Sequence, residues 1–184
     1  MTMPGTSKIV VGIAGHMGSG KTSVAHLFES ELGFQYLRYS QVLAEWFETD
    51  PTDKDRLQSV GSEVMAGEGQ IELNRRLIAR IDRSKDVVID GLRHPTDYES
   101  LYGEFNGHFF LVFVDAPPDV RFQRLAGRFS SYERFLQSDT RAVESHIDSL
   151  RPLATVVVTG MNEADDNRNF ITELVRDFRK KVVK

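Results

Sequence analysis

Five short apolar segments recur along the chain and alternate with longer segments of helical spacing. They lie at residues 9–14, 34–38, 86–90, 109–115 and 155–159. The runs Phe109-Phe-Leu-Val-Phe-Val114 and Val87-Val-Ile89 are continuously apolar, which is typical of strands covered on both faces. The pattern therefore predicts an α/β fold, in which a five-stranded parallel sheet lies between two layers of helices.

The segments between these strands predict helices, because apolar side chains recur there every three or four residues. In the first of them, Val24, Leu27 and Phe28 share one face. Prolines at 95 and at 117–118 stand where the first turn of a helix tolerates them. The expected helices are 20–32, 40–48, 53–66, 70–82, 95–104, 117–127, 131–149 and 163–181.

The properties of the whole chain fit one domain and exclude several classes of protein. The 184 residues suit a single domain over residues 1–184, since no repeat or linker divides them. The longest apolar runs have the length of strands, and the first seven residues lack the basic and apolar regions of a signal peptide. Because the chain contains no cysteine, it can form neither a disulfide framework nor a cysteine-ligated zinc site. We therefore expect a cytoplasmic protein with no membrane partner.

The charge of the chain bears on its partners. The net charge of −4 at pH 7 argues against a nucleic-acid partner. Basic residues nevertheless gather between Arg121 and Arg141, where five arginines stand against two acidic residues. We expect a monomer or homodimer that binds small molecules.

The most specific signal is a glycine-rich segment between the first strand and the first helix. It fits the P-loop pattern G-x-x-x-x-G-K-[ST] at every fixed position. In such a loop the backbone N–H groups surround the phosphates of a nucleoside triphosphate. The lysine reaches the β- and γ-phosphates, and the last hydroxyl binds Mg²⁺. The alternative is a strand–helix turn that binds nothing. We expect a P-loop NTPase fold that holds ATP and Mg²⁺ through Gly15, His16, Met17, Gly18, Ser19, Gly20, Lys21 and Thr22.

Two charged residues lie at the end of the third strand and just after it. Asp90 ends this strand, and Arg93 comes three residues later. Because ligands of parallel α/β sheets bind at the carboxyl ends of the strands, both side chains are expected beside the P-loop. A carboxylate there can hold Mg²⁺ or accept a hydrogen bond from the attacking group, and a guanidinium suits a phosphate of the second substrate. The alternatives are a turn-capping role for Asp90 and a surface ion pair between Arg93 and Asp97.

The P-loop together with Asp90-Gly-Leu-Arg93 resembles the nucleoside-monophosphate kinase group of P-loop proteins. Adenylate kinases carry a similar Asp-Gly-x-x-Arg element at this place, and dephospho-coenzyme A kinases share the overall plan. The resemblance spans most of the chain in order and spacing. It implies a three-layer kinase domain with an acceptor-binding arm at about 40–82 and a small lid at about 127–141.

The resemblance also gives roles to arginines after the fourth strand. Arg121, Arg124 and Arg128 recur there at helical spacing. Related kinases have an arginine-bearing lid in this region, whose closure brings cations onto the transferred phosphoryl group and excludes water. The resemblance implies that Arg124 contacts ATP. The residues it implies for the transfer itself are Lys21, Asp90, Arg93 and Arg128, with Thr22 and Asp90 at the metal. The alternative for each arginine is a solvated helix with salt bridges.

Two departures from the resemblance concern the acceptor. Adenylate kinases place an arginine on the helix after the second strand, where this chain has Glu45, so Arg38 at the strand end is the alternative cation. Dephospho-coenzyme A kinases carry an aspartate just after the second strand, which Tyr39-Ser40 lacks.

These features predict a Mg²⁺-dependent kinase that transfers the γ-phosphoryl of ATP to a nucleotide-like acceptor, a nucleoside or deoxynucleoside monophosphate. Two other interpretations stay open. One is a dephospho-coenzyme A kinase or another small-metabolite kinase. The other is a non-catalytic ATP-binding regulatory module.

Overall fold

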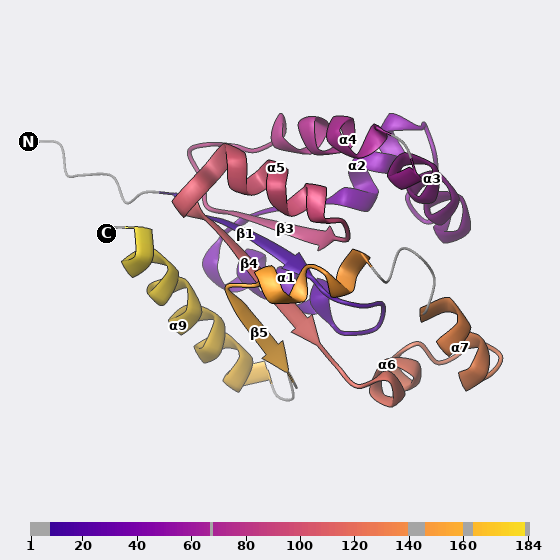
Figure 1. Cartoon of the computed structure of the whole chain (residues 1–184). Coiled ribbons are helices and arrows are strands. Elements are labelled where there is room, and N and C mark those ends of the chain that lie inside the picture. The colour runs from indigo at the N-terminus through magenta and orange to yellow at the C-terminus, as the bar shows by residue number, and fades with distance from the viewer. Residues whose placement is uncertain (1–7, 67, 140–145, 160–163, 183–184) are drawn as a thin grey trace, which may run out of the picture.

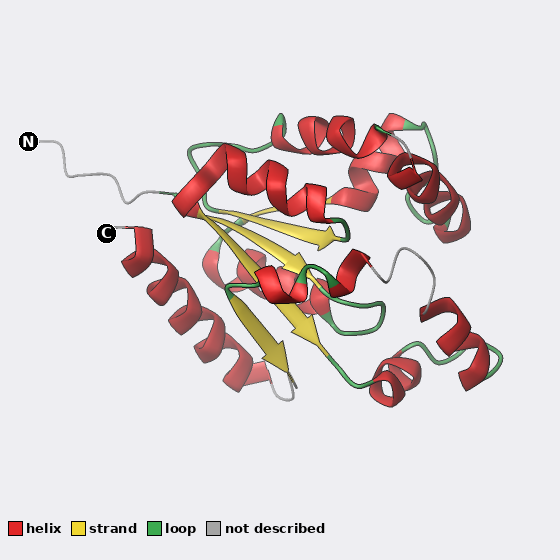
Figure 2. Cartoon of the chain, in the orientation of Figure 1, coloured by secondary structure: helices red, strands yellow, loops and turns green. Residues whose placement is uncertain are grey.

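The computed structural model describes residues 8–66, 68–139, 146–159 and 164–182, and it contains a five-stranded sheet with helices on both faces (Figures 1 and 2). Neighbouring strands all pair in parallel, in the order β2-β3-β1-β4-β5. The three-layer α/β architecture expected from the apolar pattern is therefore confirmed. The strands are β1 (Val10–Ala14), β2 (Gln35–Arg38), β3 (Val87–Leu92), β4 (Phe109–Asp115) and β5 (Val156–Thr159).

The register of the sheet brings the ends of three strands together. Ile13 of β1 pairs with Asp90 of β3, and Asp90 pairs in turn with Arg38 of β2. The loop that leaves β1 therefore starts beside Asp90 and Arg38. This edge, at the carboxyl ends of the strands, is where ligands of parallel α/β sheets bind.

Helices connect the strands and fill the two outer layers (Figure 1). Two short 3-10 turns, η1 (Asn106–His108) and η2 (Arg151–Leu153), precede β4 and β5. The α-helices are α1 (Lys21–Leu32), α2 (Tyr39–Trp46), α3 (Lys54–Ala66), α4 (Gly69–Ile78), α5 (Pro95–Phe105), α6 (Pro118–Arg124), α7 (Tyr132–Asp139) and α9 (Ala164–Val182).

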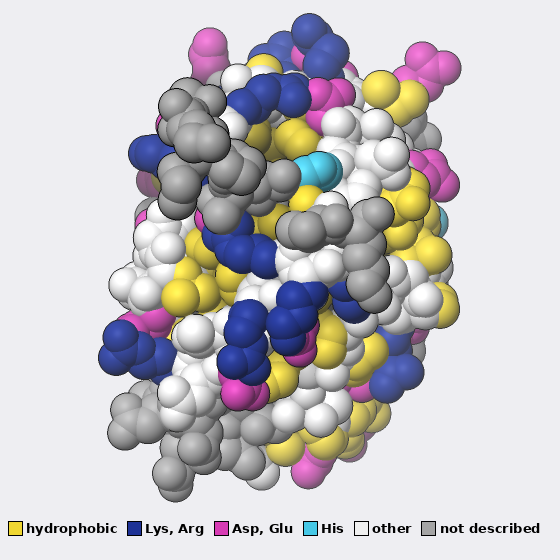
Figure 3. Space-filling model, turned by 90° about the vertical axis from the view of Figure 1, so that its left-hand side faces the viewer, with side chains coloured by type: hydrophobic (Ala, Val, Ile, Leu, Met, Phe, Trp, Pro, Cys, Tyr) yellow, Lys and Arg dark blue, Asp and Glu magenta, His cyan; other side chains and the backbone are white. Residues whose placement is uncertain are grey.

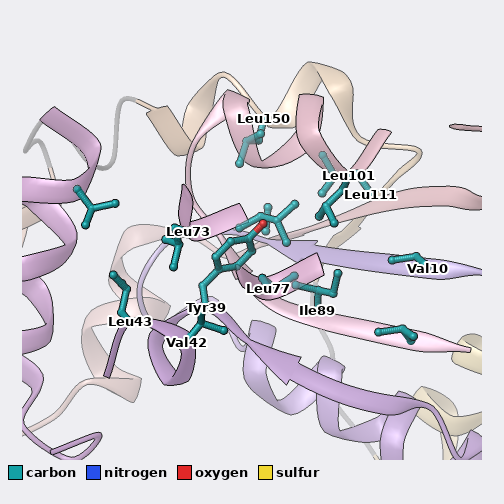
Figure 4. Close-up of a cluster of buried hydrophobic side chains, with 14 of the residues drawn as sticks. Val10, Tyr39, Val42, Leu43, Leu73, Leu77, Ile89, Leu101, Leu111 and Leu150 are labelled. Atoms are coloured by element: carbon teal, nitrogen blue, oxygen red, sulfur yellow. The ribbon is translucent and has the colours of Figure 1, made fainter. Parts of the chain in front are cut away.

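The alternation of side chains along β1 divides the core into two clusters. Val11 and Ile13 join the cluster packed by α1 and α9, whereas Val10 and Ala14 join the cluster packed by α2, α3, α4 and α5. Figure 4 shows this second cluster, where the ring of Tyr39 lies among leucines of α4 and residues of the sheet. Because both faces of the sheet are covered, the strands read as continuous apolar runs in the sequence.

Three helices end well before their predicted spans do. The helix expected over 70–82 is α4, which ends at Ile78. The helix expected over 131–149 begins as α7, but α7 ends at Asp139, residues 140–145 lie outside the described part, and a helical turn covers 146–148. The helix expected over 117–127 ends at Arg124. Gly127 has a φ of 85°, a left-handed conformation that an α-helix does not contain. Arg128 therefore does not continue the helical face of Arg121 and Arg124.

At the opposite end of the sheet, Asp86 connects the start of the chain to α9. Asp86, just before β3, accepts hydrogen bonds from the backbone N–H of Ile9 at 2.9 Å and from Arg179 of α9 at 2.5 Å. Figure 3 views this end of the molecule and shows basic side chains beside acidic and apolar ones. Among the described residues, no helix is both long and apolar enough to cross a membrane.

Candidate active site

The P-loop joins the carboxyl end of β1 to α1. Gly15, Gly18 and Gly20 have φ values of 149°, 80° and 98°, which residues other than glycine rarely adopt. A Cβ at Gly15 would lie 2.3 Å from the carbonyl oxygen of Val114, so this position also lacks the space for one. No side chain caps the N-terminus of α1, and its first N–H groups are therefore available to an anion. The local geometry suits the phosphates of a nucleotide.

One carboxylate oxygen of Asp90 joins three elements at the bottom of the site. Its Oδ2 accepts hydrogen bonds from the hydroxyl of Thr22 at 2.8 Å and from that of Tyr36 at 3.0 Å. The Nε of Arg38 lies 3.6 Å from the same oxygen. Burial, together with the negative charge of Asp90, raises the pKa of the Tyr36 hydroxyl well above its usual value, so this hydroxyl donates at neutral pH.

The second oxygen of Asp90 is a candidate metal ligand. Asp90 is 1% exposed, and its Oδ1 has no hydrogen-bond partner among the described residues. Mg²⁺ prefers oxygen ligands and takes few from protein when phosphates and water supply the rest. The hydroxyl of Thr22 and the unpartnered Oδ1 of Asp90 therefore fit a Mg²⁺ ion bound with the phosphates.

The side chains of Lys21 and His16 form hydrogen bonds within the P-loop and next to it. The Nζ of Lys21 donates to the carbonyl oxygen of His16 at 3.2 Å and so lies across the loop. The imidazole of His16 hydrogen-bonds to Asp148 at 2.8 Å and meets the ring of Phe113 edge-on. His16 thereby connects the P-loop to the helical turn at 146–148.

The three arginines after β4 have different surroundings. Arg121 is 4% exposed, and its guanidinium forms a two-bond ion pair with Asp139 at 2.5 and 2.6 Å. It fastens α7 to α6. The exposed Arg124 donates to the carbonyl oxygen of Ser19 at 2.9 Å, beside the P-loop. Arg128 is exposed as well and lines the cavity described next.

A cavity of about 290 Å³ extends from the P-loop toward the helices of the expected acceptor arm. Its walls come from the P-loop, the ends of β2 and β3, helices α2, α3 and α4, and the segment from α6 to α7. The apolar part of the lining comes mainly from Leu43, Leu57, Met65 and Leu73. The charged lining residues are Lys21, Arg38, Asp90, Arg93, Asp97 and Arg128.

A buried polar cluster forms the wall of this cavity between α4 and α5. The carboxylate of Asp97 accepts from the side-chain amides of Gln70 and Asn74, the latter at 2.8 Å. It also accepts from the backbone N–H groups of Arg93 at 2.9 Å and His94 at 3.0 Å. Burial raises the pKa of Asp97 above its usual value, although these four hydrogen bonds favour the ionised form.

The structure brings most of the residues predicted from the sequence to one place. Lys21, Thr22, Asp90, Arg93 and Arg128 all line the cavity. Arg124 donates to the carbonyl oxygens of Gly18 and Ser19 in the P-loop. The expected lid, 127–141, contains α7, and its last two residues lie outside the described part.

Other positions have contacts that the sequence did not predict. The surface-pair alternative requires an ion pair between Asp97 and the guanidinium of Arg93. Asp97 instead accepts a hydrogen bond from the backbone N–H of Arg93. Glu45 forms an ion pair with Arg80 at 2.7 Å, on a solvent-exposed side of α2. Sequence analysis missed Gln70 and Tyr36, because a lone polar residue at a helix start or in a strand carries no specific signal.

Comparison with known proteins extends this picture. A family model described as an AAA domain matches residues 11–147. The UPF0200 protein of Pyrobaculum aerophilum is 30% identical over 154 residues, which is 81% of this chain and 86% of that protein. The UPF0200 protein of Aeropyrum pernix is 24% identical over 173 residues, which is 89% of this chain and 90% of that protein.

Solved structures with this fold include kinases. Shikimate kinase from Acinetobacter baumannii, in complex with shikimate, has a TM-score of 0.62, 16% identity and 97% coverage of both chains. Shikimate kinase from Bacteroides thetaiotaomicron has a TM-score of 0.63 and 19% identity, and covers 91% of this chain and 98% of its own. A sugar kinase from Janibacter has a TM-score of 0.59 and 19% identity, and covers 92% of this chain and 95% of its own. These likenesses show a P-loop kinase-like fold. By the family match over residues 11–147 and the Pyrobaculum relative, the chain belongs to the family described as an AAA domain and to the UPF0200 proteins.

Proposed function

We propose that this protein is a Mg²⁺-dependent kinase that transfers the γ-phosphoryl of ATP to a nucleoside or deoxynucleoside monophosphate. One observation carries the proposal. The P-loop and the Thr22–Asp90 pair open into the same cavity as two arginines, Arg38 and Arg93, which come from neighbouring strand ends. Cations in that position suit an acceptor that is itself an anion.

The donor side of the site is made by the P-loop. The backbone N–H groups of the loop and the start of α1 hold the phosphates of ATP, and Lys21 turns from the carbonyl of His16 to the β- and γ-phosphates. Thr22 and Asp90 would hold Mg²⁺, and the ion when bound neutralises charge that develops on the phosphates. Arg128 reaches the transferred group from the wall of the cavity. Positioning and electrostatics are sufficient for this chemistry, so the enzyme needs no covalent intermediate.

The acidic groups of the cavity favour a phosphate acceptor over a hydroxyl acceptor. A hydroxyl must lose a proton to a general base during transfer, whereas a phosphate oxygen is already anionic at neutral pH. Within the described ranges, the carboxylates lining the cavity are Asp90 and Asp97. Asp97 already accepts four hydrogen bonds from the protein, and Asp90 is assigned to the metal. Neither suits the role of a general base toward an alcohol.

An acceptor panel tests the proposal. Release of ADP from Mg-ATP is measured with AMP, CMP, UMP, GMP and their deoxy forms. Dephospho-coenzyme A, shikimate and sugars serve as hydroxyl acceptors. We expect at least one monophosphate to raise turnover well above the ATP-only rate, and the hydroxyl acceptors to leave it unchanged. Turnover with a hydroxyl acceptor alone would contradict the acceptor class. A flat panel, with ATP still protecting the fold against heat, would instead favour a binding module.

A further inference from the structure

Gln70 is held in a fixed orientation at the wall of the cavity. It stands in the first turn of α4, and Asn74 follows one turn later on the same face. Both side chains are almost fully buried, at 6% exposure for Gln70 and 1% for Asn74, and both donate to Asp97 of α5.

The direction of these hydrogen bonds leaves one oxygen unused. Asp97 accepts from Gln70, from Asn74 and from two backbone N–H groups, so the amide nitrogen of Gln70 faces Asp97 and its carbonyl oxygen faces away. Asn74 is oriented in the same manner. Its amide nitrogen also donates to the backbone carbonyl of Gln70 at 2.9 Å, and its oxygen accepts from the hydroxyl of Tyr39 at 2.5 Å. Every group of the cluster is thus satisfied, except the Oε1 of Gln70, which has no partner in the described part of the chain.

An unpartnered buried acceptor needs an explanation, because nearly all buried polar groups in folded proteins are hydrogen-bonded. Gln70 lines the same cavity as Arg38 and Arg93. The lining of this cavity also includes the apolar side chains of Leu57 and Leu73, which would flank an uncharged, flat group. Gly61 of α3 lines the cavity as well, and its missing side chain leaves room there.

We propose that the Oε1 of Gln70 accepts a hydrogen bond from an N–H group of the acceptor's nucleobase, while the apolar side chains of the arm cover the base. Asp97 is a positioning residue in this arrangement, since it fixes which end of the Gln70 amide faces the base. The inference rests on the proposed function, because it assigns the second half of a monophosphate acceptor.

The test compares a nucleotide with an analogue that lacks one N–H donor. The pairs are AMP with purine riboside monophosphate, CMP with pyrimidin-2-one riboside monophosphate, GMP with inosine monophosphate, and UMP with its N3-methyl derivative. For the parent that wild-type protein phosphorylates, we expect kcat/KM to fall about tenfold or more when the donor is removed, chiefly through KM. This comparison needs no variant and does not depend on how a substitution folds.

The variant Gln70→Met supplies the second arm, with Gln41→Met as its matched control. Gln41 is an exposed glutamine of α2 outside the cavity lining. In Gln70→Met the preference for the parent should disappear, so that the two kcat/KM values agree within about twofold, whereas Gln41→Met keeps the wild-type ratio. Thermal unfolding of both variants checks that they are folded.

Two outcomes separate the failure of this inference from failure of the proposed function. A parent that is phosphorylated, with an analogue used equally well by wild-type protein, overturns the role of Gln70 alone. An undiminished preference in folded Gln70→Met does the same. If no monophosphate in the panel is phosphorylated, the proposed function is wrong and the role of Gln70 falls with it.

Discussion

Asp90 is the residue on which the two halves of the proposed site meet. Its Oδ2 accepts from Thr22 of the P-loop helix and from Tyr36 of β2, while Arg38 stands 3.6 Å away. Because Asp90 pairs in register with both β1 and β2, the sheet itself sets these distances. Single-residue changes in this group therefore test chemistry more directly than changes in the surrounding helices.

Lys21 gives the first prediction at this scale. Replacing Lys21 by Ala removes the cation that offsets charge on the β- and γ-phosphates, and we expect kcat to fall by about 10²–10³-fold. The matched control is Lys85→Ala, since Lys85 is an exposed lysine paired with Asp82 at the far end of β3. Steady-state kinetics with an accepted monophosphate measures both variants. Full activity in Lys21→Ala would contradict the role of the P-loop in transfer.

Asp97 predicts an unusual dependence of stability on pH. Burial raises its folded-state pKa above the unfolded value of about 3.9, so protonation favours the folded state. The stability contributed by Asp97 is thus full at low pH and declines as pH rises from the unfolded pKa through the raised folded pKa. An ordinary salt-bridged aspartate behaves in the opposite way.

Chemical denaturation of wild-type protein and Asp97→Asn between pH 3.5 and pH 8 measures this effect. The free energy of unfolding of the wild type minus that of the variant should fall as pH rises across that window and then level off. A difference that grows with pH would show that the hydrogen bonds to Asp97 outweigh its burial.

At the scale of elements, α6 and α7 are joined by one buried ion pair. Arg121 is held by Asp139 and also donates to the carbonyl oxygen of Ala116 at 3.1 Å. The ring of Phe135 in α7 packs against the same guanidinium, 5.3 Å from centroid to Cζ. The segment that carries Arg124 and Arg128 is therefore fixed to α7 through Arg121.

Breaking this ion pair should lower the free energy of unfolding substantially. Asp139→Ala leaves the Arg121 guanidinium buried without its carboxylate, and we expect the free energy of unfolding to fall by about 3 kcal/mol or more. Asp119→Ala removes an exposed acid of α6 and should cost less than about 1 kcal/mol. Replacing both partners, as Arg121→Met with Asp139→Leu, should recover most of the loss. A loss below 1 kcal/mol in Asp139→Ala would mean that solvent reaches Arg121.

Helix α3 offers a test of the cavity as an acceptor site. Gly61 lies inside the helix and lines the cavity, and a Cβ there would make only an ordinary contact with Leu43 at 3.7 Å. Gly61→Ala should stabilise the fold by about 1 kcal/mol through helix propensity. Gly61→Leu should fill the cavity and raise the KM for the acceptor at least tenfold, with the KM for ATP nearly unchanged.

Gly103→Leu is the matched control for the Gly61 variants, because Gly103 lies in α5 with nothing within 4 Å of its added Cβ. Kinetics with the accepted monophosphate and with ATP separate the two substrates. An unchanged acceptor KM in Gly61→Leu would place the acceptor elsewhere.

For the whole molecule, the sequence predicts the sheet well because its strands are covered on both faces and so are apolar throughout. The P-loop and Asp90 could be located because a motif of fixed spacing and the rule of strand ends both depend on local order. The positions of Gln70 and Asp97 could not be predicted, since their contact joins α4 to α5 across 27 residues. The burial of Arg121 likewise depends on Asp139, 18 residues away on another helix.

The claim that phosphoryl transfer takes place between two nucleotides can be tested directly by following the phosphoryl group. Protein is incubated with Mg²⁺, ATP labelled at the γ-phosphate and the accepted monophosphate, and the products are separated. We predict that the label appears in the nucleoside diphosphate made from the acceptor, in equal amount to the ADP released, and that Lys21→Ala forms this product about 10²–10³-fold more slowly. Label found only in inorganic phosphate, at the same rate with and without the monophosphate, would contradict the account and show hydrolysis instead of transfer.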